Sequence, residues 1–278
     1  MSAPRTVVAG DPAGALAPDD RGLVYGDGLF ETLALRAGVL RFRARHLARL
    51  GAGLGRLGFA VDPGVVDTVL DAAAAGLHDG VVRLVVTRGT GPRGYAPPAA
   101  PRPTIMATAY PGAPGVLPAG PLRLHLCRTP VVEHPALGGL KTLGRLAHVL
   151  ARAEWQDPAV GEGLMPDAAG RYVCGTASNL FVVVQGRLVT PSVATAGVRG
   201  IMREVVLEAA TELGLPWREG PVDAGLLAGA GEVFMTNAVA GILPVAAVAG
   251  RTLVPGPVTR RLAAALVGRG VAECAAWA

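Results

Sequence analysis

The stretch Pro111-Gly-Ala-Pro-Gly-Val-Leu-Pro-Ala-Gly-Pro121 holds four prolines and three glycines. Proline lacks an amide hydrogen, and both residue types disfavour helices and central strands. The chain has 278 residues, which exceeds the roughly 100–200 residues of a typical domain. We therefore predict a small N-terminal α/β lobe over 1–110, a linker over 111–121 and a larger C-terminal lobe over 122–278.

Helical and strand patterns are mixed on both sides of this stretch. Leucines 47, 50, 54 and 57 are spaced like one face of a helix over 43–58. Further helices are expected over 142–155 and 201–213. Strands are expected over 81–87, 104–109, 122–127, 180–184, 187–190, 233–237 and 242–248, with Gln185-Gly186 as a hairpin turn. Because strands and helices do not alternate strictly, the expected class is α+β.

The composition is that of a folded chain outside the membrane. Hydrophobic residues make up 51% and charged residues 17%, which argues against disorder. No apolar run approaches the roughly 18–20 residues of a membrane helix, and the N-terminus has no apolar signal segment. We therefore expect a cytoplasmic protein with no membrane partner.

The charge pattern does not favour nucleic acid. The net charge is +5 and the sequence pI is about 9.6, but the basic residues are scattered and only twelve aromatic residues are present. The three cysteines, Cys127, Cys174 and Cys274, form no CxxC pair. Their number and spacing disfavour a disulfide framework and a zinc site, so we expect no metal.

Lys141 is the only lysine in the chain. A codon preference for arginine explains the absence of other lysines but leaves the retention of this one unexplained. A guanidinium stays protonated and cannot replace an amine that attacks a carbonyl. Lys141 is therefore a candidate Schiff-base residue.

Two glycine-containing segments suggest phosphate binding, and only one of them has the right context. Gly53-Leu-Gly-Arg-Leu-Gly58 matches the GxGxxG pattern but lies inside a helical stripe, so we reject it as a nucleotide site. Ala196-Gly-Val-Arg-Gly-Ile-Met-Arg203 enters a helix without a Ser, Thr, Asp or Asn cap. The first amides of that helix can bind an anion, although a glycine-capped, solvated helix start explains the pattern equally well.

Five ordered motifs resemble the class IV pyridoxal-phosphate enzymes. This family includes branched-chain and D-amino acid aminotransferases and aminodeoxychorismate lyase, and the resemblance runs from about residue 20 to residue 250. The motifs are Arg21-Gly-Leu-Val-Tyr-Gly-Asp-Gly-Leu-Phe-Glu-Thr32, Phe42-Arg-Ala-Arg-His-Leu-Ala-Arg-Leu50, Leu140-Lys-Thr-Leu-Gly-Arg-Leu146, Gly175-Thr-Ala-Ser-Asn-Leu-Phe181 and Gly197–Arg203. The segments Thr87–Tyr95, Ala107–Pro111 and Thr236–Val245 are most similar to the lyase.

The resemblance implies a two-lobed D-amino acid aminotransferase-like fold, a homodimer, and pyridoxal 5'-phosphate as the cofactor. It makes Lys141 the catalytic residue. The implied cofactor-binding residues are Arg49, Cys174, Ser178, Ile201, Met202 and Asn237. The implied substrate-binding residues are Tyr25, Thr32, Arg88, Tyr95 and Tyr110, with Arg88 facing a substrate carboxylate.

Two positions depart from the family pattern. The family usually has a glutamate, which pairs with the pyridine nitrogen, where this chain has Cys174, and often an asparagine where it has Gly144. A thiol is mostly neutral at pH 7 and bonds weakly. The leading hypothesis is a lyase that converts 4-amino-4-deoxychorismate to 4-aminobenzoate and pyruvate. The alternatives are an amino-acid transaminase of the branched-chain or D-amino acid type, and a diverged member with altered cofactor chemistry.

Overall fold

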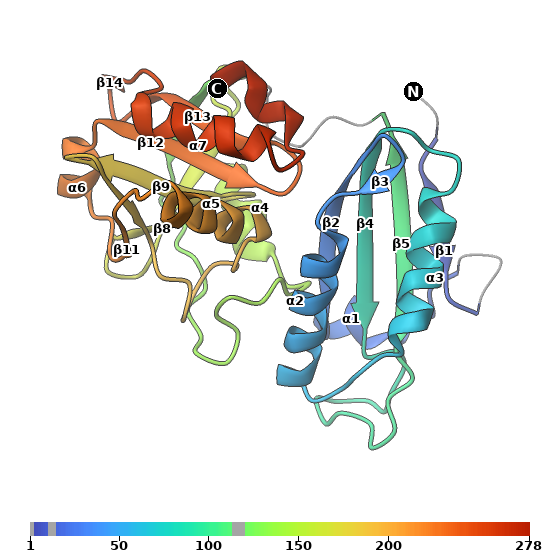
Figure 1. The fold of residues 1–278 in the computed structure, drawn as a ribbon. Coiled ribbons are helices and arrows are strands. Elements are labelled where there is room, and N and C mark those ends of the chain that lie inside the picture. The colour runs from blue at the N-terminus through green and yellow to red at the C-terminus, as the bar shows by residue number, and fades with distance from the viewer. Residues whose placement is uncertain (1–2, 11–14, 113–119) are drawn as a thin grey trace. The chain divides into compact units, whose positions relative to one another are not determined.

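The computed structural model describes residues 3–10, 15–112 and 120–278. The chain forms two compact units (Figure 1), described separately below. The first unit contains Met1–Pro114 and Leu140–Gly144, and the second contains Gly115–Gly139 and Arg145–Ala278. Most of the predicted linker falls on residues 113–119, outside the described residues, and Pro111 is the last residue of a strand.

The first unit is built on an antiparallel sheet. Its strands are β1 (Arg5–Val8), β2 (Gly28–Arg36), β3 (Val39–Leu40), β4 (Gly80–Thr87) and β5 (Thr104–Pro111), in the order β1-β5-β4-β2-β3. The pairs β2–β4 and β4–β5 run along almost the whole length of the strands. The sheet therefore has a well-fixed register, and alternate residues of each strand share one face.

Helices cover one face of this sheet. They are α2 (Arg43–Arg56), which contacts β2, and α3 (Pro63–Ala74), which contacts β5 and β1 (Figure 1). Asp62 caps α3 by accepting a hydrogen bond from the Gly64 amide, and Pro63 occupies the first turn. Leu33, Leu54 and Leu70 are fully buried between the helices and the sheet. A short helix, α1 (Arg21–Tyr25), precedes β2.

Residues Leu140–Gly144 belong to the first unit, which corrects the prediction that the C-terminal lobe carries Lys141. The Phe30 amide donates to the Lys141 carbonyl at 2.9 Å, and the Leu143 amide donates to the Gly28 carbonyl at 3.0 Å. Leu140 is buried in the core of this unit. Because the backbone of this segment pairs with β2, it cannot form the predicted helix over 142–155. The helix there, α4, spans only Leu146–Arg152.

The second unit is built on a sheet that closes on itself. Its strands are β6 (Leu122–Leu126), β7 (Glu162–Pro166), β8 (Tyr172–Gly175), β9 (Asn179–Val184), β10 (Arg187–Thr190), β11 (Trp217–Glu219), β12 (Glu232–Asn237), β13 (Gly241–Val248) and β14 (Arg251–Thr252). The order is β11-β10-β9-β12-β13-β6-β7-β8, with β14 on β13. Because β8 also pairs with β9, the run from β9 to β8 forms a barrel-like ring.

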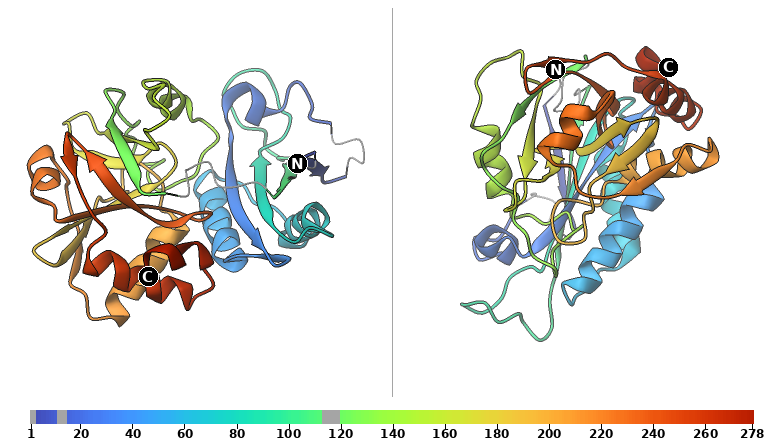
Figure 2. Two further views of the ribbon diagram at one scale, coloured as in Figure 1. Left: turned by 90° about the horizontal axis from the view of Figure 1, so that it is seen from above. Right: turned by 90° about the vertical axis from the view of Figure 1, so that its left-hand side faces the viewer.

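The helices of the second unit pack against this sheet. They are α4, α5 (Ile201–Glu212), α6 (Ala224–Gly229) and α7 (Pro257–Val267), followed by a 3-10 helix over Ala272–Trp277. Helices α5 and α7 contact each other and β12 (Figure 2). Phe181 and Phe234 stack with ring centroids 4.9 Å apart on neighbouring strands. Among the described helices, none combines the length and the apolar character needed to cross a membrane.

Several predicted elements are confirmed. The leucine stripe over 43–58 is α2, and the predicted helix over 201–213 is α5. The hairpin is β9–β10, in which Gln185 and Gly186 have φ of 50° and 73°, as a tight turn between twisted strands requires. The α+β class is confirmed.

Candidate active site

In the first unit, Lys141 lies against the open face of the sheet. Its Nζ is 4.3 Å from the centroid of the Phe30 ring, and the Arg83 guanidinium also lies over this ring, at 4.5 Å. Phe30 and Arg83 come from the neighbouring strands β2 and β4. The backbone bonds to β2 and the aromatic contact together hold the lysine on a rigid element, as a catalytic amine requires.

Arg49 is bound to a buried acidic residue that the sequence did not single out. Its Nε donates to Glu31 Oε1 at 2.8 Å, and Nη2 also bonds the carboxylate. His46, one turn earlier in α2, bonds Glu31 Oε2 through Nδ1 at 2.6 Å. Burial alone would raise the pKa of Glu31, but the bonds from His46 and Arg49 outweigh it and hold this pKa below its usual value. Arg49 is therefore oriented by Glu31 and is not a solvated surface arginine.

Tyr25 and Tyr95 lie together in the first unit. Their ring centroids are 5.4 Å apart, and the Gly94 amide donates to the Tyr25 hydroxyl. Arg21, which is 4% exposed, donates to the carbonyls of Gly94, Tyr95 and Ala96. The ring of Tyr95 is 86% exposed. The structure thus brings two of the proposed substrate residues side by side and fixes the loop between β4 and β5 through Arg21.

Thr32 and Tyr110 share the open face of the sheet with Phe30. Register places Thr32 opposite Arg83 and Tyr110 opposite Val81, so the two residues project on the side away from α2 and α3. Tyr110 is 38% exposed. Both predicted substrate residues therefore lie on the face that carries the lysine.

Arg88 is engaged within the first unit. Its Nε donates to Asp27 Oδ2 at 2.7 Å, its Nη2 donates to the Leu57 carbonyl, and its guanidinium lies over Phe59. Burial raises the pKa of Asp27, but the bonds from Arg88 and Arg21 bring it below its usual value. In this structure the Arg88 guanidinium acts as a structural anchor, which competes with the substrate-carboxylate role expected for it.

In the second unit, the start of α5 fits an anion. Gly200 is the N-cap residue, and no side chain among the described residues caps the helix, so the amides of Ile201 and Met202 lack a side-chain cap. A Cβ on Gly200 would lie 2.0 Å from Asn179 Oδ1. Asn179 is itself held by a bond from Nδ2 to the Val198 carbonyl at 2.9 Å. The backbone thus approaches β9 closely, and the positive end of the helix dipole suits a phosphate.

Ser178 is fixed by Glu162, another residue that the sequence reading missed. Ser178 Oγ donates to Glu162 Oε2 at 2.7 Å, and the same carboxylate accepts the amides of Thr176 and Ala177. Glu162 is fully buried and shapes the turn between β8 and β9. Asn237 closes another turn, because its Oδ1 accepts the amides of Val239 and Ala240.

Cys174 is buried on β8, opposite Met165 and Asn179. It is 3% exposed, and a Cβ on Gly197 would lie 3.8 Å from its sulfur. Burial, with the charge of Glu162, raises the pKa of the Cys174 thiol to about 12. The thiol is therefore neutral at pH 7 and lies next to the loop that leads into α5.

These observations test whether the chain fits the expected cofactor. The uncapped start of α5 suits a phosphate, and the Thr236 hydroxyl, fully buried on β12 next to Asn179, has no hydrogen-bond partner among the described residues. Lys141 supplies a positioned amine in the first unit. The position of Cys174 does not supply the carboxylate that the family usually has. Each unit thus carries groups of the kind that the cofactor needs, while the position expected to face the pyridine nitrogen holds a neutral thiol.

Comparison with known proteins supports membership of a family that uses pyridoxal phosphate. Residues 28–248 match the model of the amino-transferase class IV family. The solved structure of a 4-amino-4-deoxychorismate lyase from Pseudomonas aeruginosa is 46% identical, with a TM-score of 0.88 over 95% of this chain and 98% of that chain.

Two curated relatives differ in their names. A Methanocaldococcus jannaschii protein provisionally named a branched-chain-amino-acid aminotransferase is 35% identical over 87% of each chain. An aminodeoxychorismate lyase from Vibrio harveyi is 31% identical over 82% of this chain and 86% of its own length. The chain belongs to the class IV aminotransferases, a family of pyridoxal 5'-phosphate enzymes.

Proposed function

We propose that this chain is a lyase that converts 4-amino-4-deoxychorismate to 4-aminobenzoate and pyruvate. The observation that carries the proposal is the neutral, buried thiol of Cys174 at the position of the family's pyridine-pairing glutamate. The 46% identity to the Pseudomonas lyase, over nearly the whole of both chains, supports it.

The residues have distinct roles in this proposal. Bound pyridoxal phosphate supplies an electron sink for the pair left when a proton leaves the amine-bearing carbon. Lys141 binds the cofactor, removes that proton and delivers a proton to the departing enolpyruvate. Arg49 and the amides of Ile201 and Met202 hold the phosphate, while Ser178, Asn237 and Cys174 border the ring.

The substrate side of the site follows from the first unit. Thr32 and Tyr110 lie on the open sheet face that carries Lys141, and Tyr25 and Tyr95 form a neighbouring aromatic pair. We propose that these four residues border a small substrate with carboxylates. Arg88 stays a candidate only if it gives up Asp27, its present partner.

The neutral thiol bears on the choice of reaction. A carboxylate that bonds a charged group contributes roughly 1.5–3 kcal/mol, and 1.4 kcal/mol is a tenfold change in rate. A transaminase needs a developed carbanion that is protonated at another carbon. The lyase reaction ends in aromatisation, a strongly favourable step, so it tolerates a weaker electron sink better. Cys174 therefore favours the lyase.

A transaminase is the second candidate. The 35% identity to the Methanocaldococcus protein, which carries an aminotransferase name, extends over 87% of this chain and favours the transaminase. The two candidates share the lysine and the cofactor, so their substrates must distinguish them.

The test starts from the purified full-length chain with added pyridoxal phosphate. We expect visible absorption from the lysine-bound cofactor and a borohydride-trapped adduct at Lys141 that Lys141→Ala lacks. Pyruvate release from aminodeoxychorismate without an added keto acid supports the lyase. Turnover that requires 2-oxoglutarate supports the transaminase. A colourless protein with no adduct would overturn both and leave the diverged family member.

We further propose that the chain acts as a cytoplasmic homodimer. Helix α4 carries an apolar stripe formed by Leu146, Val149 and Leu150. Each of these three residues is more than half exposed. These residues are spaced as one helix face, which suits burial against a second copy.

A further inference from the structure

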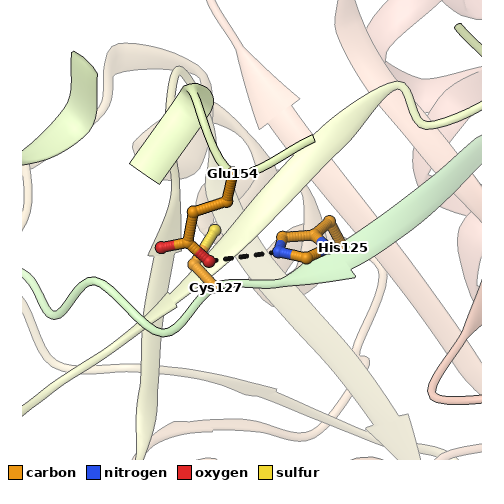
Figure 3. A group of neighbouring side chains, drawn as sticks. All are labelled: His125, Cys127 and Glu154. Carbon is orange, nitrogen blue, oxygen red and sulfur yellow. Dashed lines mark hydrogen bonds and ion pairs between the residues drawn. The ribbon is translucent and has the colours of Figure 1, made fainter. Parts of the chain in front are cut away.

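Three potential metal ligands converge in the second unit, apart from the residues assigned to the cofactor. They are His125 on β6, Cys127 just after it, and Glu154 after α4 (Figure 3). Their ligand atoms all lie within 4.8 Å of one another, and His125 Nε2 is 3.2 Å from Glu154 Oε2. No role in the proposed reaction uses these side chains.

The fold holds each ligand in place. The Cys127 amide continues the pairing of β6 with β7 by donating to the Leu164 carbonyl. Gly163 leaves room for the sulfur, because a Cβ there would lie 2.6 Å from Cys127 Sγ. The His125 ring lies beside Trp155, with centroids 5.4 Å apart. These contacts preorganise the imidazole and the thiol at the end of β6.

Glu154 is oriented by bonds that a metal would leave intact. Its Oε1 accepts the amide and hydroxyl of Thr129, and its Oε2 accepts the amide of Arg128. Each carboxylate oxygen has about two lone pairs. The remaining lone pair of Oε2 faces His125, and the exposed Arg128 guanidinium lies 3.8 Å from the same oxygen. A cation bound there replaces the His125 hydrogen bond and displaces the arginine side chain. Metal-binding carboxylates are commonly held by such outer bonds.

The geometry and charge suit zinc. Tetrahedral zinc with bonds of about 2.0–2.2 Å to nitrogen and oxygen places those two ligand atoms roughly 3.3 Å apart, close to the observed 3.2 Å. A thiolate, a carboxylate and Zn²⁺ sum to zero charge, which a buried site tolerates. Cys127 is 5% exposed, whereas 31% of the His125 side chain is exposed and offers an entry path.

We propose that His125 Nε2, Cys127 Sγ and one Glu154 oxygen bind a single Zn²⁺ ion, with water as the fourth ligand. The lack of a CxxC pair hid this site, because its ligands are a His-x-Cys pair on one strand and a distant glutamate.

Binding must release protons. An ordinary cysteine thiol is mostly protonated near pH 7. Zinc forms a bond to sulfur as the S–H bond breaks, and the proton passes to the buffer. Zinc binding at this site should therefore release a proton from the thiol.

The test uses the full-length chain, loaded with pyridoxal phosphate, treated with chelator and then titrated with zinc alone. We expect one zinc per chain by elemental analysis. His125→Ala should weaken binding at least tenfold. His78→Ala, a matched change at an exposed histidine in the first unit, should leave it unchanged.

A second measurement covers the thiol. Substituting Co²⁺ should give a sulfur-to-cobalt charge-transfer band that Cys127→Ser abolishes, with folding checked by circular dichroism. If that variant does not fold, the band in the unmodified chain and its loss in His125→Ala decide the matter. No bound zinc, or zinc that is retained equally by His125→Ala, would overturn the proposal, since the metal would then lie elsewhere, for example on the cofactor.

Discussion

Cys174 is the residue at which this chain departs most clearly from its family. Its thiol is neutral and 3% exposed on β8. If it stands beside the pyridine nitrogen, Cys174→Glu should raise turnover of the loaded enzyme by about one to two powers of ten. The same change should destabilise the protein without cofactor, because it buries a second carboxylate near Glu162. Steady-state rates and thermal melts with and without pyridoxal phosphate check both effects.

The control for this prediction is Cys174→Gln, which has the same size as glutamate without its charge. It should leave turnover close to that of the unmodified chain. Equal rates for the glutamate and glutamine variants would mean that Cys174 does not face the cofactor ring.

Glu31 is a second residue whose substitution should change the stability of the protein measurably. It is 1% exposed and is bound by His46 and Arg49. Glu31→Gln leaves a nearly buried arginine without its counter-charge, so the free energy of unfolding should fall by about 3 kcal/mol. Asp71→Asn, at an exposed pair with Arg43, should cost less than about 1 kcal/mol. Urea denaturation of the two variants checks the difference.

The same carboxylate makes stability depend on pH. The folded pKa of Glu31 lies below the ordinary value of 4.5, so the folded state binds its proton less readily than the unfolded state does. Its contribution is fully present above about pH 4.5 and is lost as the pH falls towards the folded pKa. We expect the unfolding free energy of Glu31→Gln to decline less steeply below pH 4.5. Parallel slopes for both proteins would contradict this assignment.

The three glycines of the GxGxxG pattern at the end of α2 have different surroundings. A Cβ on Gly53 would lie 2.6 Å from Leu29 Cδ1, whereas a Cβ on Gly55 meets nothing within 4 Å. Gly58 ends the helix region with φ of 77°. Gly53 is therefore needed for close packing against Leu29, and Gly58 for the turn that follows the helix. Gly55 has no such requirement.

The difference between Gly53 and Gly55 predicts that alanine substitutions at these two positions change the stability of the protein in opposite directions. Gly55→Ala should stabilise the protein by about 1 kcal/mol, because alanine loses less backbone entropy on folding. Gly53→Ala should destabilise it by about 1 kcal/mol or more, because Leu29 is packed and must move. Chemical denaturation measures both, and a gain in stability for Gly53→Ala would show that Leu29 repacks freely.

Elements with a local signal could be predicted from the sequence. The leucine stripe gave α2, and the Gln185-Gly186 turn gave the β9–β10 hairpin. The helix over 142–155 was overestimated, because Leu140–Gly144 pairs with β2 more than 100 residues earlier. The ring closure of β8 on β9 also depends on tertiary pairing, which no local pattern reports.

In the candidate site, too, residues with a local sequence signal were predicted, whereas those that depend on tertiary contacts were not. Lys141 and the bare start of α5 were predicted because each is unusual in its own segment. Glu31 and Glu162 were missed because a buried glutamate has the same letter as an exposed one, and only the structure shows the groups that surround it. Arg88 was expected to meet a substrate carboxylate, but a carboxylate of the chain itself, Asp27, already occupies it.

At the scale of the whole molecule, the proposed homodimer is directly measurable. Val149 lies on the apolar stripe of α4 and is 62% exposed. Val149→Asp should shift the chain towards the 28.2 kDa monomer in sedimentation or light scattering, because it places a charge in an apolar interface. Val132→Asp, at a residue of the same unit that is 68% exposed, should not. Dimers of undiminished affinity in Val149→Asp would exclude the α4 stripe from the interface.

The pairing of Leu140–Gly144 with β2 also sets an order of assembly on the ribosome. The first unit has all its contacts once residue 144 is free, whereas the ring of the second unit cannot close until β13 ends at Val248. At roughly 5–20 residues per second, the interval lasts about 5–20 seconds. During that time the Lys141 amine already lies on the Phe30 ring, while the ring of strands in the second unit is still open. Under the proposed function, in which Lys141 and the start of α5 both bind the cofactor, cofactor binding therefore follows completion of the second unit.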